Sequence, residues 1–327
     1  MITIGSATFA HGLWLAPMAG YTDYALRRIA REMGAEATVT EMVSAKATVF
    51  GDKKTARLAM IREEDAPCAV QIFGSEADTL ARAAERLSQG TDGVRPFAID
   101  INMGCPVPKV FGNGEGSALM RDPAHIRALV HAVVQATDLP VTVKLRSGID
   151  DAHINAVDCA LAAEDGGASA VAIHGRTRTQ LYSGTADREI IKNVKLSVHI
   201  PVIANGDITS GEAALAMLRD TQADGLMVGR GVIGNPFIFR EILAALQGAS
   251  YTPPSLDERL EVALRQLRYA IDDKGEELAV RESRKQMAAY ISGFRGAASL
   301  RNRVHQACTL AEVETAFEDL LQTAVSF

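Results

Sequence analysis

The feature that most constrains the fold of this chain is an alternation of short apolar segments with amphipathic segments. The apolar segments are rich in Val, Ile, Leu and Ala, a composition typical of strands buried on both faces of a parallel sheet. Eight of them precede residue 248: 13–16, 37–41, 69–73, 97–102, 141–145, 170–174, 202–205 and 225–228. Helices are predicted between them, for example over 75–87, 123–136, 154–165 and 210–218.

Eight strand–helix units before residue 248 predict an α/β fold, the (β/α)₈ barrel, which typically needs about 250 residues. The alternative is a doubly wound sheet, which would be expected to carry a glycine fingerprint directly after its first strand. The first strand here instead ends in Pro17-Met18-Ala19-Gly20. We therefore expect the barrel over residues 1–248.

A second unit is expected after the barrel. Residues 249–255 include Pro253-Pro254 and are predicted to be a linker. Residues 256–327 show helical periodicity and hardly any strand signal, which predicts a small helical domain.

The composition and charge of the chain exclude several classes of protein. The chain has no N-terminal signal segment and no run of about 18 apolar residues, so we expect a cytoplasmic protein without a membrane partner. Its four cysteines lie far apart and form no CxxC pair, which argues against a disulfide framework and against a metal site. The net charge of −6 means that RNA or DNA binding would require a local basic cluster.

In a barrel of this kind the active site lies at the carboxyl ends of the strands. The polar residues at those ends are therefore the candidate site residues. They are Glu41, Gln71, Asn102, Cys105, Lys144, Arg146, His174, Arg176, Asn205-Gly206-Asp207 and Gly229-Arg230-Gly231.

The glycine-bearing loops after the last two strands predict a phosphate site, because backbone N–H groups can approach an anion closely there. Asn205-Gly206-Asp207 alone could equally be an ordinary turn. Lys144 would be costly inside a barrel unless it pairs with Asp100 or Glu41, or with an anionic ligand such as a reduced flavin ring.

Cys105 is expected on a loop, because it follows strand four and precedes Pro106. Free cysteine is usually a small buried hydrophobe, the reading we give to Cys68, Cys159 and Cys308. A thiol at the catalytic face could instead act as a nucleophile or as a general acid.

Seven stretches in order along the chain resemble the dihydrouridine synthases, and the bacterial B-type branch in particular. They are residues 16–23 (APMAGYTD), 100–106 (DINMGCP), 116–119 (GSAL), 143–148 (VKLRSG), 173–177 (IHGRT), 201–208 (PVIANGDI) and 227–230 (MVGR). The resemblance implies an FMN-binding barrel, a helical domain that helps grip tRNA, and NADPH or NADH as electron donor. The implied reaction is reduction of uridine to 5,6-dihydrouridine, with hydride passing from flavin N5 to uracil C6.

The resemblance also assigns roles to individual residues. Cys105 would protonate uracil C5, and Asn102 would lie near the uracil. Pro17, Met18, Ala19, Gln71, Lys144 and His174 would contact the flavin, while Asn205, Gly206, Asp207, Gly229 and Arg230 would bind its phosphate end. Lys109, Arg146, Arg176, Arg281, Arg284 and Lys285 would contact RNA.

A basic cluster does occur in the predicted helical domain. Between residues 281 and 303 the chain carries Arg281, Arg284, Lys285, Arg295, Arg301 and Arg303 against a single acidic residue, Glu282. This favours an RNA-binding patch over a merely solvated helix face. Two positions depart from the family pattern: Asn113 stands where a basic residue is common, and Gln286 where a histidine is common.

Three alternatives remain at this point. The same chemistry could act on rRNA. The barrel could belong to a small-molecule flavin enzyme of the pyrimidine or dihydroorotate dehydrogenase type, or to an RNA-binding protein that has lost catalysis. We expect a monomer without an obligatory protein partner.

Overall fold

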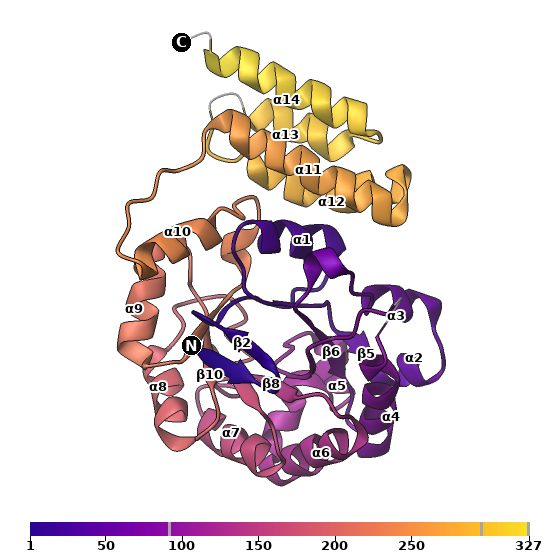
Figure 1. Ribbon diagram of the computed structural model, residues 1–327, viewed down its shortest axis with the longest axis vertical. Helices are drawn as coiled ribbons and strands as arrows, with labels where there is room; N and C mark the ends of the chain where they lie inside the picture. The colour runs from indigo at the N-terminus through magenta and orange to yellow at the C-terminus, as the bar shows by residue number, and fades with distance from the viewer. Residues whose placement is uncertain (91–92, 295–296, 326–327) are drawn as a thin grey trace.

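A closed barrel of parallel strands forms the centre of the protein. In the computed structural model, which describes residues 1–90, 93–294 and 297–325, the sheet order is β3-β11-β10-β9-β8-β7-β6-β4. An isolated parallel bridge between Trp14 and Ala37 joins the first and last of these strands. The predicted (β/α)₈ barrel is therefore confirmed, and Figure 1 shows its helices around the strands.

The eight strands coincide closely with the eight predicted segments. They are β3 (Leu13–Leu15), β4 (Thr38–Val39), β6 (Cys68–Phe73), β7 (Ala98–Met103), β8 (Val141–Arg146), β9 (Ala170–His174), β10 (Val202–Asn205) and β11 (Gly225–Val228). A short strand that was not predicted, β5 (Val43–Ser44), also pairs with β6. β4 is shorter than predicted, because the backbone leaves the sheet after Val39 and returns at β5.

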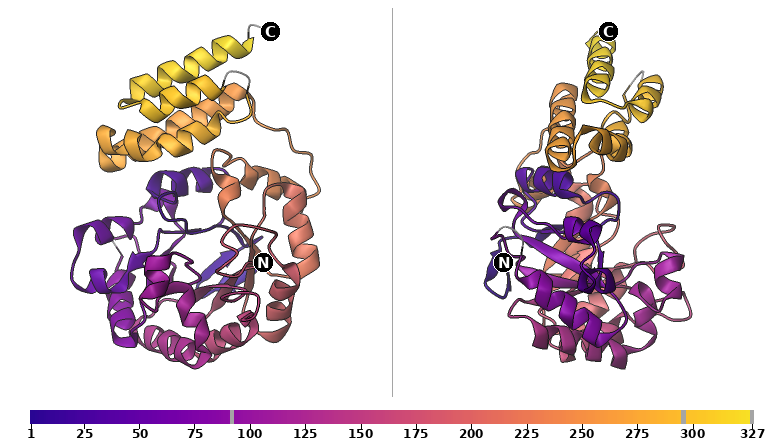
Figure 2. Two further views of the ribbon diagram at one scale, coloured as in Figure 1. Left: turned by 180° about the vertical axis from the view of Figure 1, so that it is seen from behind. Right: turned by 90° about the vertical axis from the view of Figure 1, so that its right-hand side faces the viewer.

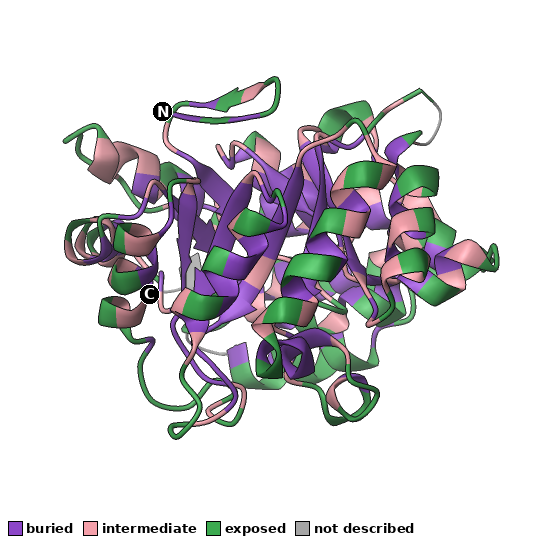
Figure 3. Ribbon diagram, turned by 90° about the horizontal axis from the view of Figure 1, so that it is seen from below, coloured by how far each residue is buried: buried purple, intermediate pink, exposed green. Residues whose placement is uncertain are grey.

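Helices cover the outside of the barrel, except that the short helix α5 lies in the loop after β7. They are α1 (Tyr24–Glu32), α2 (Ala45–Val49), α3 (Lys53–Leu58), α4 (Ala77–Ser88), α5 (Pro108–Gly112), α6 (Pro123–Ala136), α7 (Ala156–Asp165), α8 (Arg188–Ser197), α9 (Gly211–Thr221) and α10 (Ile238–Leu246). Three 3₁₀ helices, η1 (Glu63–Asp65), η2 (Gly116–Arg121) and η3 (Arg230–Val232), lie in the connecting loops. Figure 3 shows the strands buried beneath helices whose outer faces are exposed.

A hairpin that the sequence analysis did not predict covers the amino end of the barrel. It consists of β1 (Ile2–Ile4) and β2 (Ala7–Phe9), which pair antiparallel. Phe9 packs edge-to-face on Trp14 and on Phe97, with ring centres 5.4 Å apart in each pair. The hairpin thus seals one end of the barrel, and the opposite end is left for a binding site.

The inside of the barrel is narrow and only partly apolar. Along β7, Ile99, Ile101 and Met103 pack in the core under the helices, while Asp100 and Asn102 alternate with them. Such alternation sends successive side chains to opposite faces, so the polar residues point inward. Asp100 and Asn102 therefore occupy positions inside the barrel that apolar residues could otherwise fill, from its middle to the carboxyl ends of the strands.

The C-terminal part of the chain is helical, as predicted. It contains α11 (Leu256–Lys274), α12 (Glu276–Tyr290), α13 (Ala297–Gln306) and α14 (Leu310–Val325), and α11 packs against α1 of the barrel. Residues 247–255 form no helix or strand. Domain boundaries at these residues stay a prediction. Within the described residues no helix combines the length and apolarity that crossing a membrane requires.

A buried ion pair fixes the loop that follows β3. Arg27 of α1 lies 2.6 Å from Asp65 of η1, and both side chains are almost fully buried. Arg27 also donates to the carbonyl oxygens of Thr22 and Met60. The pair therefore ties α1, the preceding loop and η1 together.

We expect Asp65→Asn to lower the free energy of unfolding by about 3 kcal/mol, because it leaves the Arg27 charge buried without a counter-ion. Urea unfolding measures the change. The matched control is Arg188→Gln, which breaks the partly exposed pair with Asp220 and should cost less than about 1 kcal/mol. Equal effects of the two substitutions would contradict the role given to the buried pair.

Candidate functional site

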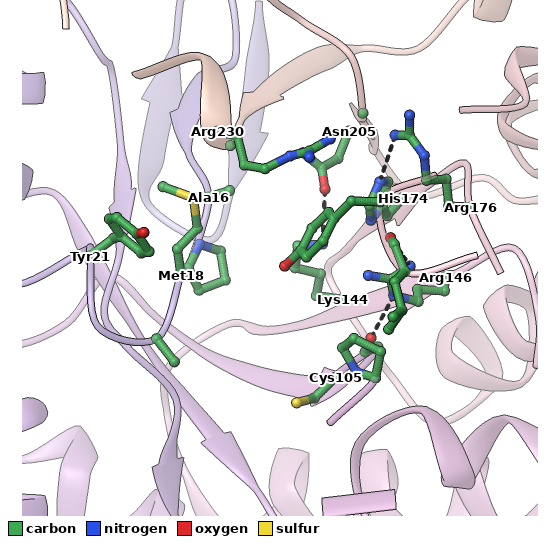
Figure 4. A pocket seen from close by; sticks show the side chains of 18 of the residues that line it. Ala16, Met18, Tyr21, Cys105, Lys144, Arg146, His174, Arg176, Asn205 and Arg230 are labelled. Carbon is green, nitrogen blue, oxygen red and sulfur yellow. Dashed lines mark hydrogen bonds between the residues drawn. The ribbon is translucent and has the colours of Figure 1, made fainter. Parts of the chain in front are cut away.

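A cavity of about 690 Å³ opens at the carboxyl ends of the barrel strands. Residues near the carboxyl ends of all eight strands line it, from Ala16 after β3 to Gly229 after β11. Figure 4 shows Met18 and Tyr21 on one side of the space, and Lys144, Arg146 and His174 on the other. This is where the sequence analysis predicted the site to be.

Most of the predicted site residues meet in this cavity. Its lining includes Pro17, Met18, Ala19, Gln71, Asn102, Cys105, Lys144, Arg146, His174, Arg176, Asn205, Gly206, Asp207, Gly229 and Arg230. Lys109, Arg281, Arg284 and Lys285 do not line it.

A chain of hydrogen bonds runs up the inside of the barrel to the loop of Cys105. Thr142 Oγ1 and Gln71 Nε2 donate to the two carboxylate oxygens of Asp100, at 2.6 and 2.7 Å. Asn102 Nδ2 donates to Gln71 Oε1 at 2.8 Å, and the Cys105 N–H donates to Asn102 Oδ1 at 2.9 Å. A carboxylate only accepts, so Asp100 sets the orientation of both amides in turn.

Cys105 is held at the cavity wall by its backbone. Ser117 Oγ donates to the Cys105 carbonyl at 2.8 Å. Gly116, with φ +59°, approaches so closely that a Cβ there would lie 2.9 Å from the Cys105 Cβ. Burial raises the pKa of the Cys105 thiol, an effect that the Arg146 and Lys144 charges oppose. The thiol therefore stays protonated at neutral pH, as a general acid requires.

Lys144 places a cation inside the cavity. Its Nζ donates to Asn205 Oδ1 at 3.0 Å, and in the described part of the chain it forms no ion pair with a carboxylate. Burial, with a smaller contribution from Arg146, lowers the pKa of Lys144 to about 8. Asp100 is bonded to Thr142 and Gln71, and Glu41 accepts from the Gly20 N–H, so neither carboxylate supplies the pairing considered as an alternative.

His174 is neutral in this setting. Burial, together with the charges of Lys144, Arg146, Arg176 and Arg230, moves its pKa far below the ordinary value. Its Nε2 forms a hydrogen bond of 3.5 Å with Arg176 Nη1, and arginine can only donate. Nε2 therefore carries the lone pair, and Nδ1 carries the proton.

The loops after β10 and β11 form one end of the cavity. A Cβ on Gly229 would meet no atom closer than 3.9 Å, so the backbone there is open to a ligand. The guanidinium of Arg230 lies 4.4 Å from the centre of the Tyr182 ring. Asp207 accepts from the Ala186 N–H and pairs with Arg176, so this carboxylate is occupied within the protein.

Two residues that are predicted to contact RNA, Arg146 and Arg176, form hydrogen bonds within the protein. Arg146 donates to the carbonyl oxygens of Gly104 and Thr177, at 2.9 and 2.8 Å. Arg176 donates to the carbonyl oxygens of Ser183 and Gly184 and is 2% exposed. Both side chains hold the loops after β7 and β9 in place. A direct contact with RNA stays a prediction for each.

Several cavity residues were not among the predicted site residues. Met42, Val107, Leu181 and Tyr182 line the cavity, and Val107, Leu181 and Tyr182 are unusually exposed for apolar or aromatic residues. They lie in loops, where no periodicity marks them. The one local signal in the sequence is that Leu181 and Tyr182 interrupt the otherwise polar segment 176–185.

The predicted basic patch is smaller than its sequence suggested. Arg281 and Lys285 are exposed one turn apart on α12, but Arg284 donates to the Ala307 carbonyl and Arg303 pairs with Asp319. Arg301 is exposed. Arg295 lies outside the described residues.

The helical region touches the cavity loop directly. Gln286 is buried; its Nε2 donates to the Tyr21 carbonyl at 3.3 Å, and its Oε1 accepts from Gln266 at 2.6 Å. Lys274 of α11 pairs with Asp23, two residues beyond Tyr21, at 2.8 Å. The segment that lines one side of the cavity is therefore anchored from α11 and α12.

Comparison with known proteins identifies the family of this chain. A family model described as dihydrouridine synthase (Dus) matches residues 14–326, which confirms the resemblance seen in the sequence. The chain is 41% identical to tRNA-dihydrouridine synthase B of Pseudomonas putida, over 92% of this chain and 89% of that protein. It is 38% identical to the probable tRNA-dihydrouridine synthase of Treponema pallidum, over 97% and 95% of the two chains.

Solved structures at lower identity share the fold. The 6-hydroxypseudooxynicotine amine oxidase of Pseudomonas geniculata superimposes with a TM-score of 0.59 at 15% identity, covering 76% of this chain and 49% of that one. A variant of NCR from Zymomonas mobilis superimposes with a TM-score of 0.55 at 15% identity, covering 79% and 93%.

We expect Lys144→Met to raise the stability of the ligand-free protein at pH 7. Because the folded pKa of about 8 lies below the ordinary 10.5, the unfolded chain binds more protons between these values, and wild-type stability rises with pH across that window. The advantage of the variant should therefore shrink from pH 8 to 10.5, as measured by urea midpoints. Lys195→Met, which breaks a pair with Asp224, should not stabilise. A Lys144→Met protein less stable than wild type at pH 7 would contradict this account.

Proposed function

This chain belongs to the dihydrouridine synthase family, and we propose that it reduces uridine to 5,6-dihydrouridine in tRNA. The observation that carries the proposal is the placement of a buried, protonated thiol, Cys105, in the same cavity as the Lys144 cation and the open glycine backbone at Gly229. Two curated relatives of nearly the same length are named tRNA-dihydrouridine synthase B or probable tRNA-dihydrouridine synthase.

The cavity fits an FMN cofactor. Its volume of about 690 Å³ is within the range usual for cofactor sites. The backbone at Gly229 and the Arg230 side chain offer donors for a phosphate, and Lys144 offers a positive charge further along the cavity. FMN, when bound and reduced by NADPH, would supply the hydride that reaches uracil C6. NADH is the alternative donor.

Lys144 and His174 would set the charge that the cofactor ring meets in the cavity. A cofactor ring that carries negative charge would raise the pKa of Lys144, which burial lowers, and would stabilise its ammonium form. His174 would donate from Nδ1 as a neutral group. Asn205 holds Lys144 through its Oδ1 and donates its Nδ2 to the Met227 carbonyl at 2.7 Å, so the lysine has a fixed position.

Cys105 would deliver the proton to uracil C5. Transfer from the thiol leaves a thiolate, and the charges of Lys144 and Arg146 favour that form. Water would then return a proton to Cys105, which completes the balance of one hydride at C6 and one proton at C5. Asn102, bonded to the Cys105 N–H, would keep the thiol in position while Gln71 fixes Asn102.

The target uridine would have to leave its stack in the folded tRNA and enter the cavity, at a cost of a few kcal/mol. Arg281 and Lys285 on α12, with Lys109 on α5, are the exposed cations of the predicted set that are available to RNA phosphates. We further propose that the protein acts in the cytoplasm as a monomer.

The test of the function is nucleoside mass spectrometry of tRNA and rRNA from cells that lack the protein. We expect dihydrouridine to disappear from one or more tRNA positions and to return when the gene is restored. An unchanged content in both RNAs would overturn the proposal, and a loss confined to rRNA would overturn the assignment to tRNA.

Cys105→Ala should lower kcat for tRNA reduction by about 10²–10⁴-fold, the usual contribution of a positioned acid. Flavin content and tRNA affinity should be unchanged, because the Cys105 backbone makes the contacts that hold the loop. Cys308 is exposed, so the prediction that it is buried was wrong. Cys308→Ala is therefore a suitable matched control and should keep full turnover. Full turnover by Cys105→Ala would remove Cys105 from the acid role.

A further inference from the structure

Two arginines share one aromatic ring beside the cavity. The guanidinium carbon of Arg178 lies 3.8 Å from the centre of the Phe111 ring, and that of Arg121 lies 4.5 Å from it. The three residues come from different segments: Phe111 from α5, Arg121 from the end of η2, and Arg178 from the loop after β9. We call this group the arginine stack.

The arginine stack carries charge that nothing in the described part of the chain neutralises. Several other arginines that stack on a ring also form an ion pair with an acid, as Arg28 does with Glu32 and Arg62 with Asp273. Arg121 and Arg178 form no ion pair among the described residues, and Arg178 Nε is buried without a hydrogen-bond acceptor. Two like charges held on one ring repel each other, so an anion between or beside them would be stabilised.

The position of the arginine stack points to the kind of anion. Val107 and Pro108, at the start of the Phe111 segment, line the cavity, and so do Leu181 and Tyr182 of the Arg178 loop. The stack therefore joins the two loops that border the cavity near Cys105. Figure 1 labels α5 on the barrel, and Figure 2 shows the orange and yellow helices α11 to α14 beyond one side of the barrel. Of these helices, α12 carries Arg281 and Lys285.

We propose that the arginine stack binds backbone phosphates of the RNA whose uridine enters the cavity. The inference rests on the proposed function, since a nucleotide turned into the cavity places its flanking phosphates at the rim. Guanidinium groups recognise phosphate oxygens with paired hydrogen bonds, and the Phe111 ring orients both groups before RNA arrives. RNA would thus be held from two sides, by the arginine stack on the barrel and by α12 of the helical region.

The experiment compares the double variant Arg121→Gln/Arg178→Gln with wild type in its flavin-loaded form. Binding of an unmodified tRNA transcript is measured at several salt concentrations. We expect affinity to fall about tenfold at low salt, and the slope of log affinity against log salt to become shallower by about 2, one unit for each lost phosphate contact. The control Arg82→Gln/Arg219→Gln removes the same charge from the outer helices α4 and α9 and should behave as wild type.

The single variant Arg121→Gln should fold as wild type does, because Arg121 is exposed. It should make the slope of log affinity against log salt shallower by about 1, and its unfolding temperature should be unchanged. At saturating tRNA, kcat of the double variant should stay near wild type while KM rises. A double variant with the slope and affinity of the control would overturn the arginine stack and leave the proposed function standing. A wild-type protein that neither binds tRNA nor forms dihydrouridine would overturn both.

Discussion

The structure depends on one constraint, namely that a closed parallel barrel covers both faces of every strand. Polar groups inside it must then find partners inside it, because water cannot reach them. The chain from Thr142 through Asp100, Gln71 and Asn102 meets this requirement and ends on the N–H of Cys105. The hydrogen bonds that satisfy the polar groups inside the barrel therefore also set the position of the Cys105 backbone.

The cavity has an excess of positive charge, which suits an anionic ligand. Lys144 has an amide oxygen as its partner and a lowered pKa, and burial together with the surrounding cations lowers the pKa of His174 and keeps it neutral. Asp207 is already paired with Arg176 and adds no free negative charge. A site built in this way loses some stability without its ligand and regains it on binding, which is a common compromise in binding sites.

The helical region does more than supply basic residues. Gln286 and Lys274 bond to the segment around Tyr21 and Asp23, and Arg27 holds the same segment from the barrel side through the Thr22 carbonyl. Gln286, which departs from the family pattern, thus belongs to the contact between the helical region and the barrel and has no exposure to RNA. A shift of α11 and α12 relative to the barrel would therefore displace the segment that contains Met18 and Tyr21. Both residues line the cavity.

The sequence by itself determined the strand–helix order and the list of residues at the carboxyl ends of the strands. Both follow from local regularities: apolar segments of a few residues alternate with helical periods, and each strand end is marked by its first polar residue. The predicted segments 170–174, 202–205 and 225–228 coincide with β9, β10 and β11 for this reason.

Only the tertiary structure decided what the individual side chains do. Arg146, Arg176 and Arg284 look like ligands of RNA in the sequence, but each also has a partner within the protein that is far away in the chain: the Gly104 carbonyl, Asp207 and the Ala307 carbonyl, respectively. Phe111 meets Arg178 across 67 positions of sequence, and β1 and β2 meet the barrel through the Phe9 ring. The physical reason is the same in every case: the partner of a long side chain is set by packing between segments far apart in the chain, and no local pattern records it.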